Sequence, residues 1–167
     1  MDGKLILGID PGLNTTGYAV IRRLDGATMH LCEAGVIRSR QRDPMETRLA
    51  ELHAGVSEVL QAHRVDLMAL EQLFSHYERP RTAILMGHAR GVICLAASQA
   101  GIPVTHFEPT RVKKVITGNG RAPKSQIQQA VKLQLNLTAV PEPADVADAM
   151  ALSLCGHYLG SGSLAER

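Results

Sequence analysis

The first apolar run and the turn behind it constrain the fold of this chain more than any other stretch. Residues 5–9 read Leu-Ile-Leu-Gly-Ile, and Asp10-Pro11-Gly12 follows at once. A near-continuous apolar run of this length, bounded by turn residues, predicts a strand buried on both faces of a sheet. An unpaired carboxylate buried at the end of such a strand would cost on the order of several kcal/mol. We therefore expect Asp10 to face solvent, a metal ion or a phosphate-bearing ligand. Taken alone, the stretch fits a strand followed by an ordinary Asp-Pro-Gly turn equally well.

Length and composition predict one domain of ordinary size. The chain has 167 residues, of which 45% are hydrophobic, enough for a full sheet with covering helices. We expect this domain to span 1–159, with a small, polar and flexible C-terminal tail at 160–167. The formal net charge of +2 is too small to indicate a nucleic-acid partner by itself.

The cysteines and the N-terminus predict a cytoplasmic location. Cys32, Cys94 and Cys155 lie far apart and have no C-x-x-C spacing, which indicates reduced thiols rather than a zinc site. No signal-peptide pattern and no apolar run of membrane-spanning length is present in the sequence. We expect no contact with a membrane.

Two extended runs follow the first strand and predict an antiparallel meander. They cover 18–24 and 28–38 and flank Asp25-Gly26, which is a strong two-residue hairpin signal. The sheet is therefore expected to open with three strands joined in sequence.

A helix is expected next, with its cap readable from the sequence. Asp43 is placed to cap it, Pro44 suits its first position, and Glu46 completes a capping-box spacing. Its apolar residues recur on one face that we expect to cover the sheet: Met45, Leu49, Leu52, Val56, Val59 and Leu60.

A second short apolar run, 67–70, ends in Glu71 and so repeats the feature seen at Asp10. A helical crossover separates it from the first strands, so it is expected to lie parallel to the first. Both carboxylates would then leave the sheet at the same edge. The rest of the chain adds a helix at 80–100, a strand at 102–107, and helices at 110–116, 124–137 and 144–159.

The helix at 80–100 is rich in small residues, which permit close packing onto the sheet or onto a second subunit. Together these elements predict an α/β fold. Its five-stranded mixed sheet, an antiparallel meander followed by parallel strands, is flanked by helices.

Asp145 and Asp148 project from the first turn of the last helix. They could be surface acids that stabilise the helix dipole, or they could join Asp10 and Glu71. Four clustered acids would repel one another and raise at least one pKa unless a cation were present. Carboxylates without nearby Cys or His favour magnesium or manganese over zinc. Two such ions, about 3.5 to 4 Å apart, suit phosphodiester hydrolysis.

Six ordered motifs span almost the whole chain. They are G-I-D-P-G with T-G-Y over 8–18, L-E-Q-L-F over 70–74, G-H-A-R-G-V over 87–92, V-K-K through G-N-G over 112–120, K-S-Q over 124–126, and A-D-V-A-D-A over 144–149. In this order they resemble the RuvC-type Holliday junction resolvases, which are crossover junction endodeoxyribonucleases of the ribonuclease H-like superfamily. The resemblance implies a ribonuclease H-like fold and a magnesium-dependent nuclease.

The resemblance also implies roles for individual residues. Asp10, Glu71, Asp145 and Asp148 match the family's catalytic carboxylates, which hold two Mg²⁺ per subunit, with Mn²⁺ able to substitute. Asp10 would bridge both ions, and which ion the other acids serve stays open. Lys113 and Lys124 match positions that contact the scissile phosphate region, although their charge alone fits two solvated lysines equally well.

An aromatic and basic surface is implied beside the acids. Phe74 matches the aromatic that stacks on a base near the junction centre, and the alternative is packing on the sheet edge. The other residues expected to contact DNA are Tyr77, Arg79, Arg81, Arg111, Lys114 and Arg121, in addition to Lys113 and Lys124. We expect His76 and His88 to be ordinary polar residues.

The implied activity is resolution of four-way junctions by paired, symmetric nicks in homologous recombination and DNA repair. The near two-fold symmetry of a junction favours a homodimer, and RuvA and RuvB, the branch-migration proteins, are implied partners. Two other classes compete with this interpretation. One is a nucleotide-binding protein of the actin and sugar-kinase superfamily, which also has a D-x-G turn but needs two lobes. The other is a junction-binding protein without catalysis, which leaves the four acids unexplained.

Overall fold

The computed structural model describes residues 3–72 and 79–160. Its strands are β1 (Leu5–Asp10), β2 (Thr15–Arg23), β3 (Met29–Arg38), β4 (Leu67–Glu71) and β5 (Val104–Phe107). Its helices are α1 (Met45–Ala62), α2 (Pro80–Gln99), α3 (Pro109–Thr117), α4 (Lys124–Gln134) and α5 (Ala144–Leu159).

The strands form one sheet in the order β3-β2-β1-β4-β5. The first three strands pair antiparallel, whereas β4 is parallel to β1 and β5 is parallel to β4. The predicted α/β fold with a five-stranded mixed sheet is confirmed. The first strand lies at the centre of this sheet, as its unbroken apolar run predicts.

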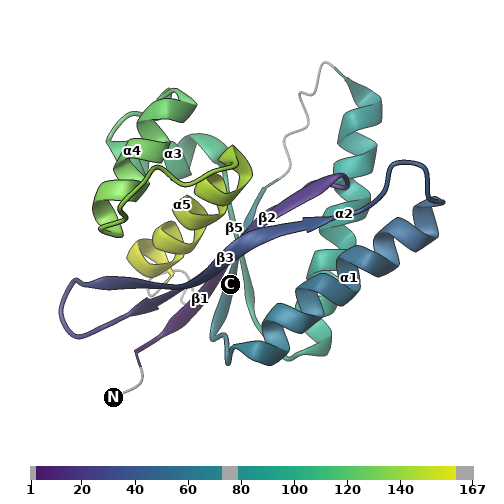
Figure 1. Cartoon of the computed structure of the whole chain (residues 1–167), viewed down its shortest axis with the longest axis horizontal. Coiled ribbons are helices and arrows are strands. Elements are labelled where there is room, and N and C mark those ends of the chain that lie inside the picture. The colour runs from purple at the N-terminus through teal and green to yellow at the C-terminus, as the bar shows by residue number, and fades with distance from the viewer. Residues whose placement is uncertain (1–2, 73–78, 161–167) are drawn as a thin grey trace.

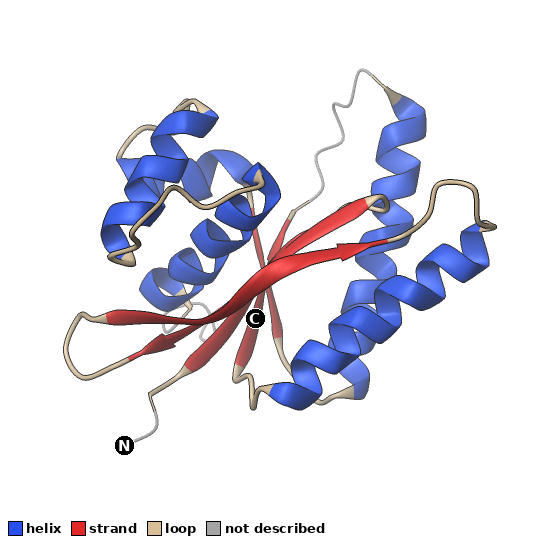
Figure 2. Ribbon diagram, viewed as in Figure 1, coloured by secondary structure: helices blue, strands red, loops and turns tan. Residues whose placement is uncertain are grey.

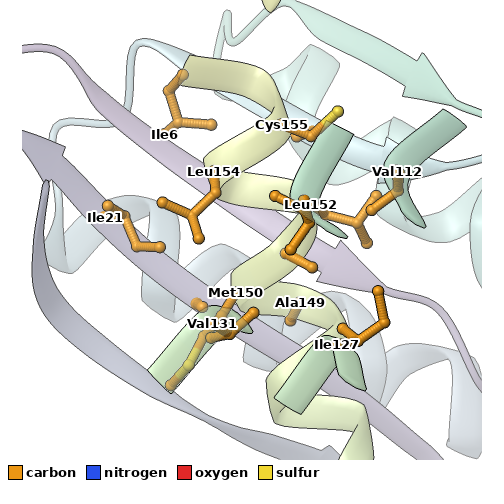
Figure 3. Packing of buried hydrophobic residues seen from close by; sticks show 14 of the residues in the cluster. Ile6, Ile21, Val112, Ile127, Val131, Ala149, Met150, Leu152, Leu154 and Cys155 are labelled. Atoms are coloured by element: carbon orange, nitrogen blue, oxygen red, sulfur yellow. The ribbon is translucent and has the colours of Figure 1, made fainter. Parts of the chain in front are cut away.

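Helices cover both faces of the sheet (Figures 1 and 2). On one face α5 packs on the sheet and contacts α3 and α4, while α1 and α2 lie together on the other face. Each face has its own apolar cluster. Figure 3 shows the cluster around α5, in which Leu152 and Leu154 of the helix lie among side chains from the strands and from α3 and α4.

Turn residues end the elements largely where the sequence predicts. Gly26, in the β2–β3 hairpin, has φ +78°, and Gly101, which follows the C-cap residue of α2, has φ +71°. These are left-handed conformations that glycine adopts without strain. Helix α5 has the predicted bounds.

The predicted cap of α1 is wrong. Pro44 occupies the N-cap position, and no side chain caps the helix. Asp43 lies one residue too early, and its N–H donates to the carbonyl of Arg40 at 3.0 Å. A local turn therefore precedes the helix in place of a capping box.

Three other boundaries shift by two or three residues, and one of them is the start of β5, at Val104 rather than at 102. Strand β2 begins at Thr15 rather than at 18, because pairing with Arg38 of β3 extends the ladder across the polar start of the strand. Helix α4 ends at Gln134 rather than at 137, because Asn136 takes a left-handed conformation with φ +51°.

The three cysteines are unpaired, as predicted. Among the described residues, the helices are too short or too polar for a membrane span. The predicted contact residues Phe74 and Tyr77, together with His76, lie outside the described residues, and so does the tail beyond residue 160.

Candidate active site

Two parallel strands deliver the first pair of carboxylates. Asp10 is the last residue of β1 and Glu71 is the last residue of β4. Ile9 stands opposite Leu70 in the parallel register, so the two acids that follow leave the sheet side by side. The prediction that they share one sheet edge is confirmed.

Helix α5 brings the second pair by packing directly on the backbone of the sheet. A Cβ added to Gly17 would lie 2.1 Å from the carbonyl oxygen of Asp145, and one added to Gly8 would lie 2.0 Å from that of Ala149. Neither contact leaves space for any side chain, so hydrogen is the only substituent that fits. The two glycines thus set how closely Asp145 and Asp148 approach the strand ends.

Buried hydroxyl groups tie the same region together. The Ser153 hydroxyl of α5 donates to the carbonyl oxygen of Ile6 in β1 at 2.8 Å. The Thr16 hydroxyl donates to the carbonyl oxygen of Gly12 at 2.5 Å and accepts from the Gly12 N–H at 3.3 Å, which closes the turn after Asp10. These bonds join α5 to β1 and fix the turn that follows Asp10.

All four carboxylates line one cavity of about 290 Å³. Lys113 of α3 and Lys124 of α4 line the same cavity. Its other walls are mainly apolar: Pro109, Val112, Ile127, Ala151 and Leu152. Acids from three distant parts of the sequence therefore meet two lysines in one concave site.

Among the four acids, burial and repulsion by the other carboxylates shift the pKa of Asp10 most. Burial raises the pKa of this carboxyl from 3.8 to about 9, helped by the charges of Glu71, Asp148 and Asp145 and by a hydrogen bond with Asp145. At neutral pH and without a cation, Asp10 is therefore held in its protonated form.

The pKa values of Glu71 and Asp148 are also raised, and nearby cations oppose these shifts. Burial and Asp148 raise the pKa of Glu71, whereas Lys113, Arg90 and Lys124 lower it. The pKa of Asp148 is raised chiefly by burial, and Lys124 opposes the shift. The two lysines thus offset part of the negative charge.

Arg90 of α2 is a site residue whose individual role the sequence did not predict. Its Nε donates to the carbonyl oxygen of Glu71 at 2.9 Å, and its Nη2 donates to Nδ1 of His106 at 2.7 Å. Arg90 therefore fixes the end of β4 and places a positive charge beside the Glu71 carboxylate. Its position within the G-H-A-R-G-V motif was the available signal, but the contact to a backbone carbonyl has no sequence signature.

The donor set suits a hard divalent cation. Its members are carboxylates from Asp10, Glu71, Asp145 and Asp148, and oxygen donors of this kind favour magnesium or manganese. The raised pKa of Asp10 shows how unfavourable the cluster is without positive charge. Within residues 3–72 and 79–160, no three His, Cys, Asp or Glu side chains are already arranged to hold an ion. The acids line the cavity without converging on a single point.

The remaining predicted DNA contacts are exposed and do not line the cavity. Arg79 and Arg81 lie at the start of α2, Arg111 and Lys114 lie on α3, and Arg121 precedes α4. Their side chains are accessible, which a phosphate contact requires.

Comparison with known proteins identifies the family. The family model described as crossover junction endodeoxyribonuclease RuvC matches residues 6–157. The chain belongs to the RuvC family. The RuvC of Rhodopirellula baltica is 75% identical over 159 residues, covering 95% of this chain and 89% of that protein. The RuvC of Gloeobacter violaceus is 39% identical over 158 residues, covering 95% and 90%.

A solved RuvC structure has the same fold. RuvC of T. thermophilus, determined in complex with a Holliday junction substrate, superposes with a TM-score of 0.89 at 31% identity. The match covers 94% of both chains. The resemblance to the RuvC family that the sequence motifs indicate is therefore confirmed.

Proposed function

We propose that this chain is an endonuclease that resolves Holliday junctions by paired, symmetric hydrolysis of phosphodiester bonds, in recombination and DNA repair. The observation that carries the proposal is the meeting of four acids and two lysines in one cavity of a RuvC-family chain. The junction substrate in the T. thermophilus RuvC structure supports the choice of DNA.

We propose that Asp10, Glu71, Asp145 and Asp148 are catalytic residues that hold two Mg²⁺ ions, with Mn²⁺ as a substitute. Asp10 is the most central candidate, because its pKa is affected by all three of the other acids. Bound ions would supply Lewis-acid stabilisation of the phosphate charge and lower the pKa of the attacking water. Asp10 must lose its proton when this charge arrives.

The two lysines would act on the DNA. Lys113 and Lys124 line the cavity beside the acids and carry positive charge that a scissile phosphate can meet. Their role would be to orient the phosphate and stabilise the negative charge that develops on it during hydrolysis. The same charges would also reduce repulsion between the acidic cluster and the DNA backbone.

A homodimer would place one such site on each side of a near two-fold junction. Helix α2 supports this, because it leaves an apolar stripe uncovered: Ile84 is 62% exposed and Leu95 is 50% exposed. They lie eleven residues apart and so share one side of the helix. Between them, Gly87 and Gly91 open to free space. On the inner side of the same helix, Ala89, Ala96 and Ala97 are buried in the core. The small residues of α2 therefore allow close packing onto the protein interior, and they would allow close packing against a second subunit as well.

The remaining contacts complete the proposal. Arm DNA would meet the exposed basic residues Arg79, Arg81, Arg111, Lys114 and Arg121, and Phe74 and Tyr77 would stack on or beside bases at the junction centre. RuvA and RuvB would supply branch migration, and all would act in the cytoplasm.

The direct test is incubation of a labelled synthetic four-way junction with the protein and magnesium. We expect paired nicks at symmetric positions on opposite strands, leaving ends that ligase seals. Junction binding without cutting would favour the non-catalytic alternative, and ATP binding by calorimetry would favour the nucleotide-binding one.

A further inference from the structure

A basic loop lies at the active-site end of the sheet but outside the cavity. It starts at Arg38, the last residue of β3, leads to α1, and carries three exposed arginines, Arg38, Arg40 and Arg42. Among the residues that the structure describes, no carboxylate forms a salt bridge with any of the three. The acids nearest in sequence are Asp43 and Glu46, so the loop keeps an excess of positive charge.

The loop is joined to the turn that follows Asp10. The Ser39 N–H donates to the carbonyl oxygen of Asn14 at 3.2 Å, and the Ser39 hydroxyl donates to that of Leu13 at 2.5 Å. Figure 1 shows the β3–α1 connection beside the β1–β2 turn at the same end of the sheet. The basic loop and the catalytic strand end are therefore neighbours.

A buried arginine holds this arrangement in place. Arg48 of α1 is only 8% exposed. Its Nε donates to the Ser39 hydroxyl at 3.1 Å, and its Nη2 donates to Oδ1 of Asn14. A buried cation bonded to neutral oxygens is costly unless its contacts are kept. Arg48 thus fixes the loop to the β1–β2 turn, so that the exposed arginines are presented by a rigid support.

The sheet register gives the spacing from the cavity. Asp10 pairs with Gly17, and Arg38 pairs with Thr15, which lies two residues before Gly17 in β2. Ordinary strand spacing and rise then separate the Cα atoms of Asp10 and Arg38 by about 12 Å. Successive phosphates of one DNA strand advance about 3.4 Å along the helix axis, so this spacing corresponds to roughly three or four nucleotides.

We infer that Arg38, Arg40 and Arg42 form a second phosphate-binding surface, which grips the backbone of the duplex arm a few base pairs from the bond to be cut. The inference rests on the proposed nuclease function and names a contact surface for it. The contacts are with phosphates, so they would add affinity and orientation without reading the base sequence.

The test compares the triple variant Arg38→Gln/Arg40→Gln/Arg42→Gln with the wild-type protein on a labelled four-way junction. Each lost phosphate contact reduces the slope of log affinity against log salt by about 0.9. The wild-type protein should then lose about 40-fold more affinity than the triple variant between 50 and 200 mM salt.

The control is Arg23→Gln/Arg64→Gln, which removes two exposed arginines from the opposite end of the sheet. We expect its salt slope to match that of the wild type. An unchanged slope in the triple variant, or an equal fall in this control, would overturn the inference. Thermal unfolding of each variant shows whether the fold is kept.

Neutral methylphosphonates in the arm, three to eight nucleotides from the scissile bond, locate the contact. They should weaken binding by the wild-type protein and leave binding by the triple variant nearly unchanged. If the methylphosphonates weakened binding by the wild-type protein and by the triple variant to the same extent, contact between the arginines and those phosphates would be contradicted. Failure of the nuclease proposal looks different: the wild type would bind the junction with the expected slopes but would not cut it in magnesium.

Discussion

The pKa values of carboxylates are shifted in opposite directions on the two faces of the sheet. On the α5 face, burial and neighbouring acids raise the pKa values of Asp10, Glu71 and Asp148. On the α1 face, Glu33 accepts hydrogen bonds from Tyr18 at 2.8 Å and pairs with His63 at 2.6 Å, and these contacts lower its pKa. The first group is stable as a cluster only with added positive charge, whereas Glu33 already has its partners.

The difference separates a site from a structural contact. Both groups are acids near strand residues, and the sequence shows no charge pattern that distinguishes them. What distinguishes them is clustering: the α5 face gathers several like charges around one cavity, and groups with such perturbed pKa values are typical of functional sites. The predictions below test that distinction.

The largest effect is expected from Asp10→Asn. Loss of a metal ligand should reduce junction cutting by more than about 10³-fold, while junction affinity changes only a few-fold. The matched control is Glu33→Gln on the opposite face, which should cut like the wild type. Magnesium-dependent cutting at full rate by Asp10→Asn would remove the acid from the mechanism.

A smaller loss of junction cutting is expected from Gly17→Ala. The new methyl group would lie 2.1 Å from the Asp145 carbonyl oxygen, so α5 must move away from the strand ends. A displacement near 1 Å at a catalytic site costs about 100-fold in rate, and Tm should fall as well. Gly55→Ala is the control on the α1 face, because the atoms nearest to its methyl group belong to the Ile37 side chain, the closest at 2.7 Å, and that side chain can rotate. Equal effects of the two variants on cutting would refute the positioning role of Gly17.

The stability of the metal-free protein should depend on pH through Asp10. Its folded-state pKa of about 9 lies above the ordinary 3.8, so the folded state binds the proton more tightly than the unfolded state. The associated stability is present at low pH and is lost as pH rises toward 9. We expect Tm, measured in EDTA, to fall by several degrees between pH 5 and pH 9. Asp10→Asn should flatten this dependence, and an equally steep fall in the variant would show that other groups cause it.

The smallest effect is expected from Glu33→Gln. The lowered pKa of Glu33 means that its contribution to stability is present above pH 4.5 and is lost as pH falls through the folded-state value. The Glu33 side chain is 41% exposed, so solvent screening limits the contribution to below about 1 kcal/mol. Urea unfolding should show a small difference in stability from wild type at pH 7 and a smaller one at pH 3. A loss of stability that is larger at pH 3 than at pH 7 would contradict the lowered pKa of Glu33.

The sequence predicted the strands of the sheet and the carboxylates well because both leave local signals. Apolar runs ending in Asp10 and Glu71 mark parallel strand ends, and the spacing of Asp145 and Asp148 marks one helix face. The cap of α1 failed because Asp43 and Pro44 each suit a helix start, and only the folded chain decides which residue takes the position. The contacts of Arg90 and Arg48 were missed because both residues join separate segments of the chain through acceptors that carry no charge.

The central claim is that clustered, partly protonated acids are assembled to receive cations. It is tested most directly by titrating the metal-free protein with magnesium in a calorimeter at pH 7, in two buffers of different ionisation enthalpy. Because Asp10 is protonated before the ion binds, we predict the release of about one proton per chain on binding, and no such release from Asp10→Asn. Magnesium binding without proton release, or the same release from Asp10→Asn, would contradict the account.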